Sequence, residues 1–378
     1  MHPEVQAGIS TAGRLYKTYK GTIFFSSLDG LRCLSILAVI WHHTGRYVEA
    51  INLTRAGALG VDLFFAISGF LITTLLLRER ERWGSISIRA FYIRRALRIF
   101  PLYYTTVILY VISVYALERN TPVGRQFFDN LPYFLTYTAN WFVGLDGRVI
   151  FYFAWSLSTE EQFYLVWPTL EKLLRGWRPA ALIILLLLAR TAVEALVNFG
   201  VLDKQSFATI VLLSIHPAIL GGALMAHTLH DPRSFRLIEP MLGSRWAALS
   251  LLLGLFAAIE IALPREPVWF LMVLLVGSVV IRESNSLSLF LRWRPIAYIG
   301  MVSYGMYLMH MLCYNAIKKL LGTFGTEHPW LYFPATVLLV TATAAISYQY
   351  YESWFLRMKE RFTRVPSRHP VGADFGTK

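Results

Sequence analysis

Charged residues and cysteine are both scarce in this sequence. Only 16% of the 378 residues are charged, and Cys33 and Cys313 are its only cysteines. Because soluble domains usually contain about 25% charged residues, the composition disfavours a soluble globular protein. Both cysteines lie in apolar segments, so we interpret them as small buried residues and exclude a disulfide framework. Glycine and proline, at 25 and 16 residues, are too few for a collagen-like or low-complexity chain.

Apolar sequence is abundant instead. Hydrophobic residues make up 56% of the chain, and the mean hydropathy is +0.48. A helix that crosses a bilayer needs about 20 mostly apolar residues. The sequence therefore predicts an all-α polytopic membrane protein with about ten transmembrane helices. The predicted spans are 28–48, 61–77, 99–117, 156–173, 180–199, 207–228, 246–263, 267–282, 296–316 and 331–355. Residues 127–145 are apolar but contain Asp129 and Pro132, so we predict a re-entrant or interfacial segment there.

The net charge of +13 follows from where the basic residues lie. In a soluble protein such a charge would suggest a nucleic-acid partner, which we do not expect here because the basic residues lie between apolar runs. With the N-terminus in the cytoplasm, 25 Lys and Arg residues fall on the cytoplasmic side and 9 on the outer side. Cytoplasmic loops carry such an excess, so we predict that both termini are cytoplasmic and that the protein is a multi-pass protein of the inner or plasma membrane.

The chain divides into three predicted parts. Residues 1–27 are a cytoplasmic segment without the apolar stretch of a secretory signal. Residues 28–356 form the membrane domain, and residues 357–378 are a basic cytoplasmic tail. We find no internal repeat, which disfavours the transporter folds that are built from inverted repeats.

Ionisable residues within the first predicted span suggest a function, because such residues are costly in a membrane. Arg32 and His43 are eleven residues apart. A helix turns through about 1100° over that distance, roughly 20° more than three full turns, and rises by roughly 16 Å. The two side chains therefore share one helical face, and His42 lies about 80° away from it. Alternatively, Arg32 anchors the helix at the interface and His43 is a hydrogen-bonded core histidine.

Two further segments place charge near this helix. Asp62 begins the second predicted span on the outer side, toward which His43 points. It could orient the imidazole, as a carboxylate orients a catalytic base, or it could cap its own helix. Arg95 and Arg98 are three residues apart and therefore neighbours on a helix. Their guanidinium groups suit phosphates at the cytoplasmic mouth, although ordinary positive-inside charge is the alternative.

Two later spans carry polar stripes. Glu160 and Glu161 point about 100° apart, so only one of them should face a cavity, and Glu161 shares a face with Tyr164. The alternative is a pair of acids at the positive end of a helix dipole. Ser303, Tyr307 and His310 form a stripe at i, i+4 and i+7, which could instead serve as interhelical hydrogen-bond donors and acceptors. The nine histidines form no liganding cluster with carboxylates, so we expect no metal.

Five segments in this order resemble the acyltransferase-3 family of integral membrane acyltransferases, which includes bacterial O-antigen and exopolysaccharide O-acetylases. The resemblance runs from about Leu28 to Phe355. It implies transfer of an acyl group, commonly acetyl, from cytoplasmic acyl-CoA to a hydroxyl of a carbohydrate or lipid-linked glycan. The sequence departs from the family pattern at His42, because one histidine is the rule, and at Ala154, where relatives often carry a polar residue. Some members add a hydrolase-like domain after the last span, and we expect that domain to be absent here.

The roles that we expect follow from the chemistry of acyl transfer and from the matched motifs. His43 is the expected general base, oriented by Asp62 or Glu161. Arg32, Arg95 and Arg98 are expected to bind acyl-CoA, most simply acetyl-CoA. The residues expected on the acceptor or oxyanion side are Trp155, Ser156, Tyr164, Ser303, Tyr307 and His310. The competing function is a transporter or flippase of a glycolipid or polysaccharide precursor. The acceptor, the acyl chain length and the oligomeric state are not specified by the sequence.

Overall fold

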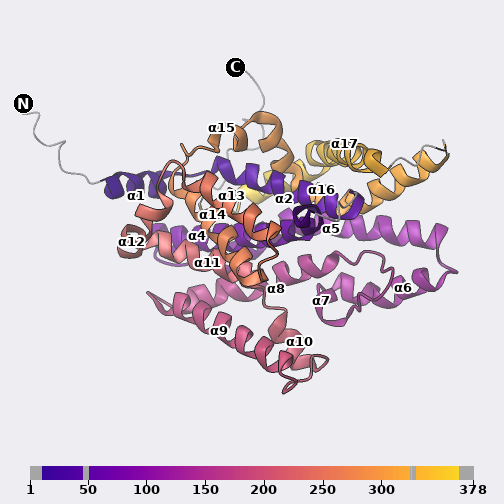
Figure 1. The fold of residues 1–378 in the computed structure, drawn as a ribbon, viewed down its shortest axis with the longest axis horizontal. Coiled ribbons are helices and arrows are strands. Elements are labelled where there is room, and N and C mark those ends of the chain that lie inside the picture. Colours follow the sequence, from indigo (N-terminus) through magenta and orange to yellow (C-terminus); the bar gives the residue numbers. More distant parts are fainter. Residues whose placement is uncertain (1–10, 46–50, 324, 326–328, 366–378) are drawn as a thin grey trace, which may run out of the picture.

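A computed structural model describes residues 11–45, 51–323, 325 and 329–365 of the chain, and within this part every regular element is a helix (Figure 1). The elements of the first half are α1 (Thr11–Gly21), α2 (Ser26–Thr44), α3 (Asn52–Arg55), η1 (Ala56–Leu59), α4 (Gly60–Trp83), α5 (Ile88–Leu117), α6 (Pro122–Leu135), α7 (Ala139–Phe142), α8 (Ala154–Leu173) and α9 (Arg178–Asn198). Those of the second half are α10 (Phe207–Leu213), α11 (Pro217–His230), α12 (Pro232–Leu242), α13 (Ala247–Glu260), α14 (Arg265–Ile281), α15 (Ser288–Leu291), α16 (Arg294–Thr323), α17 (Pro329–Ser347), the π-helical η2 (Tyr348–Glu352) and α18 (Ser353–Glu360).

Each of the ten predicted spans overlaps a helix, but the count of ten is not confirmed. In the part of the chain that the structure describes, five helices are long and apolar enough to cross a membrane. The number rises to eight if each of three bent helix pairs is one span, and the bends in these pairs measure 74°, 44° and 70°. Two of the predicted spans correspond to helices that are not among these candidates. The helix α8 has 20 residues but carries four charged residues, and α14 has only 17 residues.

Two other predicted segments are also visible in the structure. The segment predicted as re-entrant or interfacial overlaps α6 and contains α7, which have 14 and 4 residues and are too short to span a bilayer. The basic tail predicted at 357–378 begins within α18, and residues 366–378 lie outside the described part. The cytoplasmic placement of both termini stays a prediction.

The turn between α4 and α5 follows from local sequence. Gly84 ends α4 in the left-handed conformation with φ of 70°, which glycine adopts without a steric penalty, and its N–H donates to the Arg80 carbonyl. The side chain of Ser87 caps α5 by accepting from the Ala90 N–H. The carboxylate of Glu79, buried at 1% exposure, accepts from the Ser87 N–H at 2.8 Å and from Arg94 at 3.1 Å. These bonds fix the start of α5, where the arginine motif lies.

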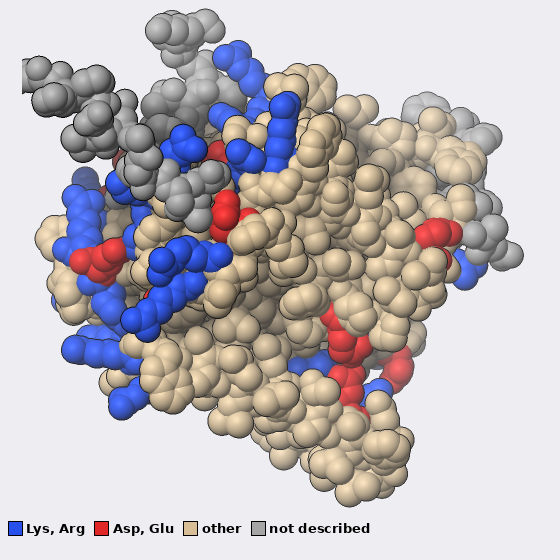
Figure 2. Space-filling view, turned by 60° about the vertical axis from the view of Figure 1, so that its left-hand side comes forward, with Lys and Arg blue, Asp and Glu red and all other residues tan. Residues whose placement is uncertain are grey.

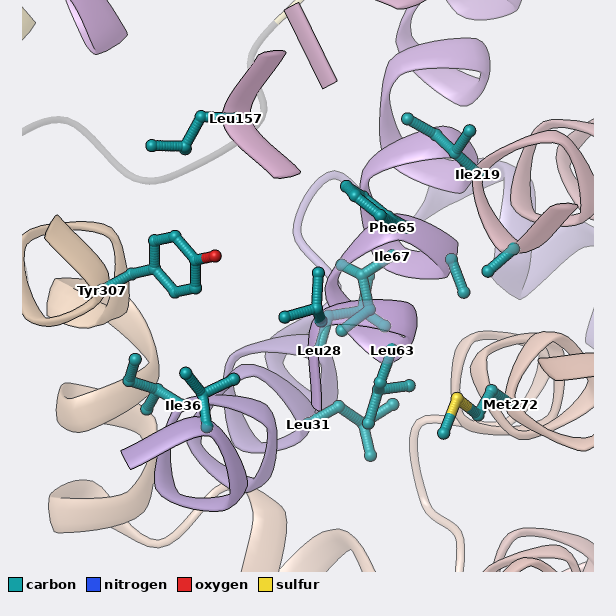
Figure 3. Packing of buried hydrophobic residues seen from close by; sticks show 14 of the residues in the cluster. Leu28, Leu31, Ile36, Leu63, Phe65, Ile67, Leu157, Ile219, Met272 and Tyr307 are labelled. Atoms are coloured by element: carbon teal, nitrogen blue, oxygen red, sulfur yellow. The ribbon is translucent and has the colours of Figure 1, made fainter. Parts of the chain in front are cut away.

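The core of the bundle lies where α2, α4, α11 and α14 meet. Figure 3 shows Leu31 of α2, Leu63 of α4, Ile219 of α11 and Met272 of α14 in one buried cluster. Tyr307 extends into the same region from α16. In Figure 1, α9 runs along an edge of the bundle, and only 6% of its most apolar stretch is buried within the protein. Such an exposed apolar helix fits a lipid-facing position.

Close backbone contacts hold the central helices together. A Cβ atom at Gly300 of α16 would lie 1.8 Å from the Asp29 carbonyl oxygen of α2. A Cβ at Gly69 of α4 would lie 1.9 Å from the Ile219 carbonyl oxygen of α11. Both distances are shorter than any side chain allows, so these helices can approach only because glycine occupies these positions. The first contact sets the position of α16 against α2, which carries His43.

We therefore expect Gly300→Ala to destabilise the protein by about 1–3 kcal/mol, because the added methyl group must push α16 away from α2. The melting temperature of the detergent-solubilised full chain measures the effect. Gly254→Ala is the matched control, since a Cβ there has no neighbour within 4 Å. Equal melting temperatures for the two variants would contradict the importance of this contact.

Candidate functional site

The predicted donor arginines meet at one end of the helix bundle. Arg32 of α2 and Arg95 and Arg98 of α5 all line two cavities, of about 120 Å³ and about 110 Å³. We call the first the arginine pocket; Arg78, Arg94 and Lys359 also line it. We call the second the central cavity; it continues along α8 and α16 to Ser156 and Tyr307. Since the three predicted arginines line both, they lie at the junction between the two cavities.

Other arginines around the arginine pocket have structural partners. Arg78 donates to the carbonyls of Thr22 at 2.7 Å and Tyr19 at 3.1 Å. Arg94 bonds the Glu79 carboxylate and donates to the Phe362 carbonyl at 2.8 Å. These two residues therefore tie α1 and the segment after α18 to the pocket. The sequence alone could not separate them from Arg95 and Arg98.

Figure 2 shows that Lys and Arg gather at one side of the face in view, while most of the rest carries neither basic nor acidic residues. This side is the left-hand end of Figure 1, which carries α1 and α12. A cluster of cations at one end of an apolar bundle produces a positive potential there, which attracts anionic ligands.

The acidic motif of α8 lines the central cavity beside these arginines. The guanidinium carbon of Arg95 lies 4.6 Å from the centre of the Tyr164 ring, and the Tyr164 hydroxyl donates to the Glu160 carboxylate. Glu161 lines the same cavity, so both acids face it and the expectation that only one would do so is wrong. The next residue of the motif, Gln162, exchanges two 2.9 Å hydrogen bonds with Asn140 and thereby holds α7 against α8.

The central cavity ends at a pair of hydroxyl groups. Ser156 of α8 and Tyr307 of α16 have their hydroxyl oxygens 2.5 Å apart, and each hydroxyl also lies within hydrogen-bond distance of the Phe153 carbonyl. Because the two hydroxyls carry two protons in all, one of them donates to the carbonyl and the other donates to its neighbour or to the same carbonyl. Ser303 lines the cavity one turn before Tyr307. Trp155 does not line this cavity; its ring lies 6.1 Å from Phe65.

His43 lies beyond these hydroxyls, in a pair with His310. His43 Nδ1 is 3.2 Å from His310 Nε2, and His310 Nδ1 is 2.5 Å from the Tyr307 carbonyl oxygen. His310 is fully buried, and its ring lies 4.9 Å from the Phe153 ring. His43 is not among the residues that line the central cavity, whereas Ser156 and Tyr307 are. The sequence placed His310 on the acceptor side and missed its contact with His43, because nothing in the chain specifies how α2 and α16 are paired.

The hydrogen bonds of this pair fix the tautomers of both rings. A carbonyl oxygen can only accept, so the proton of His310 must be on Nδ1. The Nε2 of a neutral His310 then offers a lone pair, and it can only accept from the Nδ1–H of His43. Both rings are neutral in this arrangement, because each carries a single ring proton. The Val39 carbonyl, one turn earlier on α2, also accepts a hydrogen bond from the His43 ring. With the ring proton of His43 on Nδ1, its Nε2 is unprotonated and can act as a base.

The predicted partner of His43 bonds another residue. Asp62 Oδ1 lies 3.2 Å from Nε2 of His216, the residue that precedes α11. The ring of His216 is 4.5 Å from the Phe65 ring. Asp62 thus links α4 to α11 in the structure. His216 was not singled out from the sequence, since only its place in space distinguishes it from the other histidines.

In the described ranges, no group of three or more His, Cys, Asp or Glu residues could hold a metal ion. Cys33 and Cys313 are both free and buried. The functional groups that gather in the bundle are therefore arginines, hydroxyls, carboxylates and the histidine pair.

Comparison with known proteins adds independent information. A family model described as "Acyltransferase domain" matches residues 25–349. The chain is 24% identical to the peptidoglycan O-acetyltransferase OatA of Listeria monocytogenes over 320 residues, which are 76% of this chain and 49% of that protein. It is 28% identical over 331 residues to a Bacillus subtilis protein named "putative peptidoglycan O-acetyltransferase YrhL", covering 76% and 48% of the two chains. The chain thus spans about half the length of these relatives. No solved structure matches it.

Proposed function

The chain belongs to the acyltransferase-3 family, and from this premise we propose that it is a membrane O-acyltransferase that moves an acetyl group from acetyl-CoA to a hydroxyl of a carbohydrate. The histidine pair carries the proposal. It leaves the Nε2 of His43 free on the same helix as Arg32, which lines the cavities of the cationic end. The transporter alternative accounts for charged residues in the bundle, but the family match favours the enzyme.

We place the donor at the cationic end of the bundle. Arg95 and Arg98 would bind the phosphates of CoA, because guanidinium groups form paired hydrogen bonds with phosphate oxygens. Arg32 lies at the junction of the two cavities, where it would hold the donor arm. The roughly 16 Å between Arg32 and His43 along α2 then separates the phosphate site from the reacting thioester. This end would face the cytoplasm, where acyl-CoA is made.

The thioester would react near Ser156 and Tyr307. His43 Nε2 takes the proton of the acceptor hydroxyl while the oxygen attacks the carbonyl carbon of the thioester. The new C–O bond forms, the C–S bond breaks, and the leaving thiolate takes the proton back from His43. During the step His43 is cationic, and the hydrogen bond from its Nδ1–H to His310 stabilises that charge.

The hydroxyls of Ser156 and Tyr307 would stabilise the oxyanion of the tetrahedral intermediate. They form the end of the central cavity, so the donor arm would replace their mutual hydrogen bond on arrival. Ser303 and Tyr164 would line the path, and Trp155 would support it from behind. Glu161 would hold Arg95 in place from across the cavity, and Asp62 would act only through His216.

We expect His43→Ala to lower acyl transfer by roughly 10²–10⁴-fold, the usual contribution of a general base. Mass spectrometry of ester-linked acyl groups on cell-surface glycans would measure it, in cells that make each variant at equal level in the membrane. His42→Ala is the matched control and should keep near-normal transfer, because its ring packs beside His43 outside the hydrogen-bonded chain. Normal transfer by His43→Ala would remove this residue from the mechanism.

His310 is a positioning residue in this proposal, and it can be tested through its hydrogen bonds. His310→Leu should lower kcat by roughly 10–150-fold, which corresponds to losing a hydrogen bond to a charged group of about 1.5–3 kcal/mol. His310→Gln should restore much of the rate, because its amide can accept from His43 and donate to the Tyr307 carbonyl. A merely structural role would not distinguish Gln from Leu at equal melting temperature.

If Arg95 and Arg98 bind the donor, replacing either of them should specifically weaken the binding of acyl-CoA. Arg95→Gln and Arg98→Gln should each raise the KM for acyl-CoA at least tenfold, because each removes a charge-assisted phosphate contact of about 1.5–3 kcal/mol. Arg89→Gln removes the same charge from an exposed position on α5 outside both cavities and should change KM little. Equal effects of all three substitutions would show that only the overall charge matters.

A further inference from the structure

A third and larger pocket lies at the other end of α5. It has a volume of about 760 Å³ and is bounded by α5 between Tyr110 and Glu118, by residues 145–153 and by α16 between Met311 and Lys319. We call it the aromatic pocket. It lies about 24 Å along α5 from the donor arginines, counted from Arg98 to Val114. Its volume is within the range of ligand-binding pockets, and the proposed donor site does not use it.

The walls of the aromatic pocket are mainly apolar. Val114, Val149 and Leu312 contribute aliphatic surface, and Phe151 adds an aromatic ring. The neighbouring outer face of α5 is also apolar, since Ile112 is 59% exposed. The pocket is therefore next to a helix face that suits lipid. A free polysaccharide, whose surface is covered with hydroxyls, would instead need a groove rich in hydrogen-bonding groups.

One polar group of the wall lacks a partner. Tyr110 is 4% exposed, and its hydroxyl makes no hydrogen bond with any residue of the described part. A buried hydroxyl without a partner is destabilising, and a ligand with a hydroxyl, amide or phosphate group could supply the missing bond.

The charges at the rim suit an anionic group. Arg148 forms two hydrogen bonds with the Glu118 carboxylate, at 2.9 and 2.8 Å, and so these two charges offset each other. Lys319 is exposed and has no ion pair within the described ranges. One cation thus remains at the mouth, where it can bind an anion such as a phosphate.

The inner end of the aromatic pocket reaches the histidine pair. Tyr152 lines the pocket, and its ring lies 5.6 Å from the ring of His43. Phe153 also lines the pocket, and its ring lies 4.9 Å from that of His310. Aromatic side chains of the pocket wall therefore lie next to the proposed base and its partner, and none of the residues that line this pocket also lines the central cavity.

We propose that the aromatic pocket binds the acceptor and that this acceptor is a saccharide joined through phosphate to a long apolar chain. The apolar chain lies along the walls next to the lipid, the phosphate binds Lys319, and a sugar hydroxyl reaches past Tyr152 to His43. The donor and the acceptor thus approach His43 from opposite ends of the bundle. This inference rests on the proposed acyl transfer, because His43 matters to it only as the base.

The test uses the full-length protein in nanodiscs and polyprenyl-diphosphate-linked N-acetylglucosamine as the probe. Ala316→Trp places an indole in the pocket at an exposed position of α16. It should weaken binding of the probe at least tenfold and leave acetyl-CoA binding unchanged. Lys319→Gln should weaken it roughly fivefold. Ile112→Trp, on the lipid-facing side of α5, is the control and should bind the probe like the unmodified protein.

The outcomes separate this inference from the proposed function. Binding of the probe is measured in His43→Ala as well, where it should persist while transfer is lost. Equal binding by Ala316→Trp and Ile112→Trp, or no binding by the unmodified protein, would overturn the acceptor site. Equal acetylation of N-acetylglucosamine oligomers without a lipid chain would overturn the lipid-linked class of acceptor. Binding that depends on residue 316 without any acetyl transfer would instead refute the proposed function and leave the lipid site standing.

Discussion

The hydrogen bond between His43 and His310 is the interaction on which the proposed chemistry depends. A neutral histidine inside an apolar helix bundle can act as a base only if one ring nitrogen carries the proton and donates a hydrogen bond. The other ring nitrogen must keep a free lone pair. His310 can hold Nδ1 of His43 because its own Nδ1 is committed to the Tyr307 carbonyl. This direction of donation follows from the carbonyl, which has no proton to give. The chemistry therefore depends on a main-chain atom of α16, and that helix is positioned by the close contact at Gly300.

In the rest of the bundle, the basic residues are concentrated away from this histidine pair. Cations are concentrated at the start of α5 and around the arginine pocket, whereas the histidines are surrounded by aromatic rings. Charged groups inside a membrane are costly, and here they line cavities or pair with one another, as Arg32 does with Asp29. In the proposed reaction an anionic donor and an alcohol reach the pair from opposite ends, and the hydroxyls of Ser156 and Tyr307 line the central cavity on the proposed donor side.

Much of this arrangement was predictable from the sequence. The features that could not be predicted all depend on how separate helices pack against one another or bend. The helical class and a helix at each of the ten predicted spans follow from apolar runs, and the shared face of Arg32 and His43 follows from helical geometry within one element. Arg32, Arg95 and Arg98, which the sequence assigned to donor binding, line the same two cavities, and their role stays a proposal. The partners of His43 and Asp62 could not be foreseen, because His310 and His216 come from helices whose packing is set by glycine contacts far along the chain. The count of ten spans is not confirmed, because three helix pairs are bent and α8 carries four charged residues.

Solid-state NMR of the full chain in lipid, with ¹⁵N-labelled histidine, tests the central claim most directly. The resonances of His43 and His310 would be assigned by comparison with variants that lack each ring. We predict that both rings are neutral at pH 7, with the proton on Nδ1 and a free lone pair on the Nε2 of His43. A proton on the Nε2 of His43, or a cationic His310, would contradict the proposed hydrogen-bond direction and the role of His43 as the base.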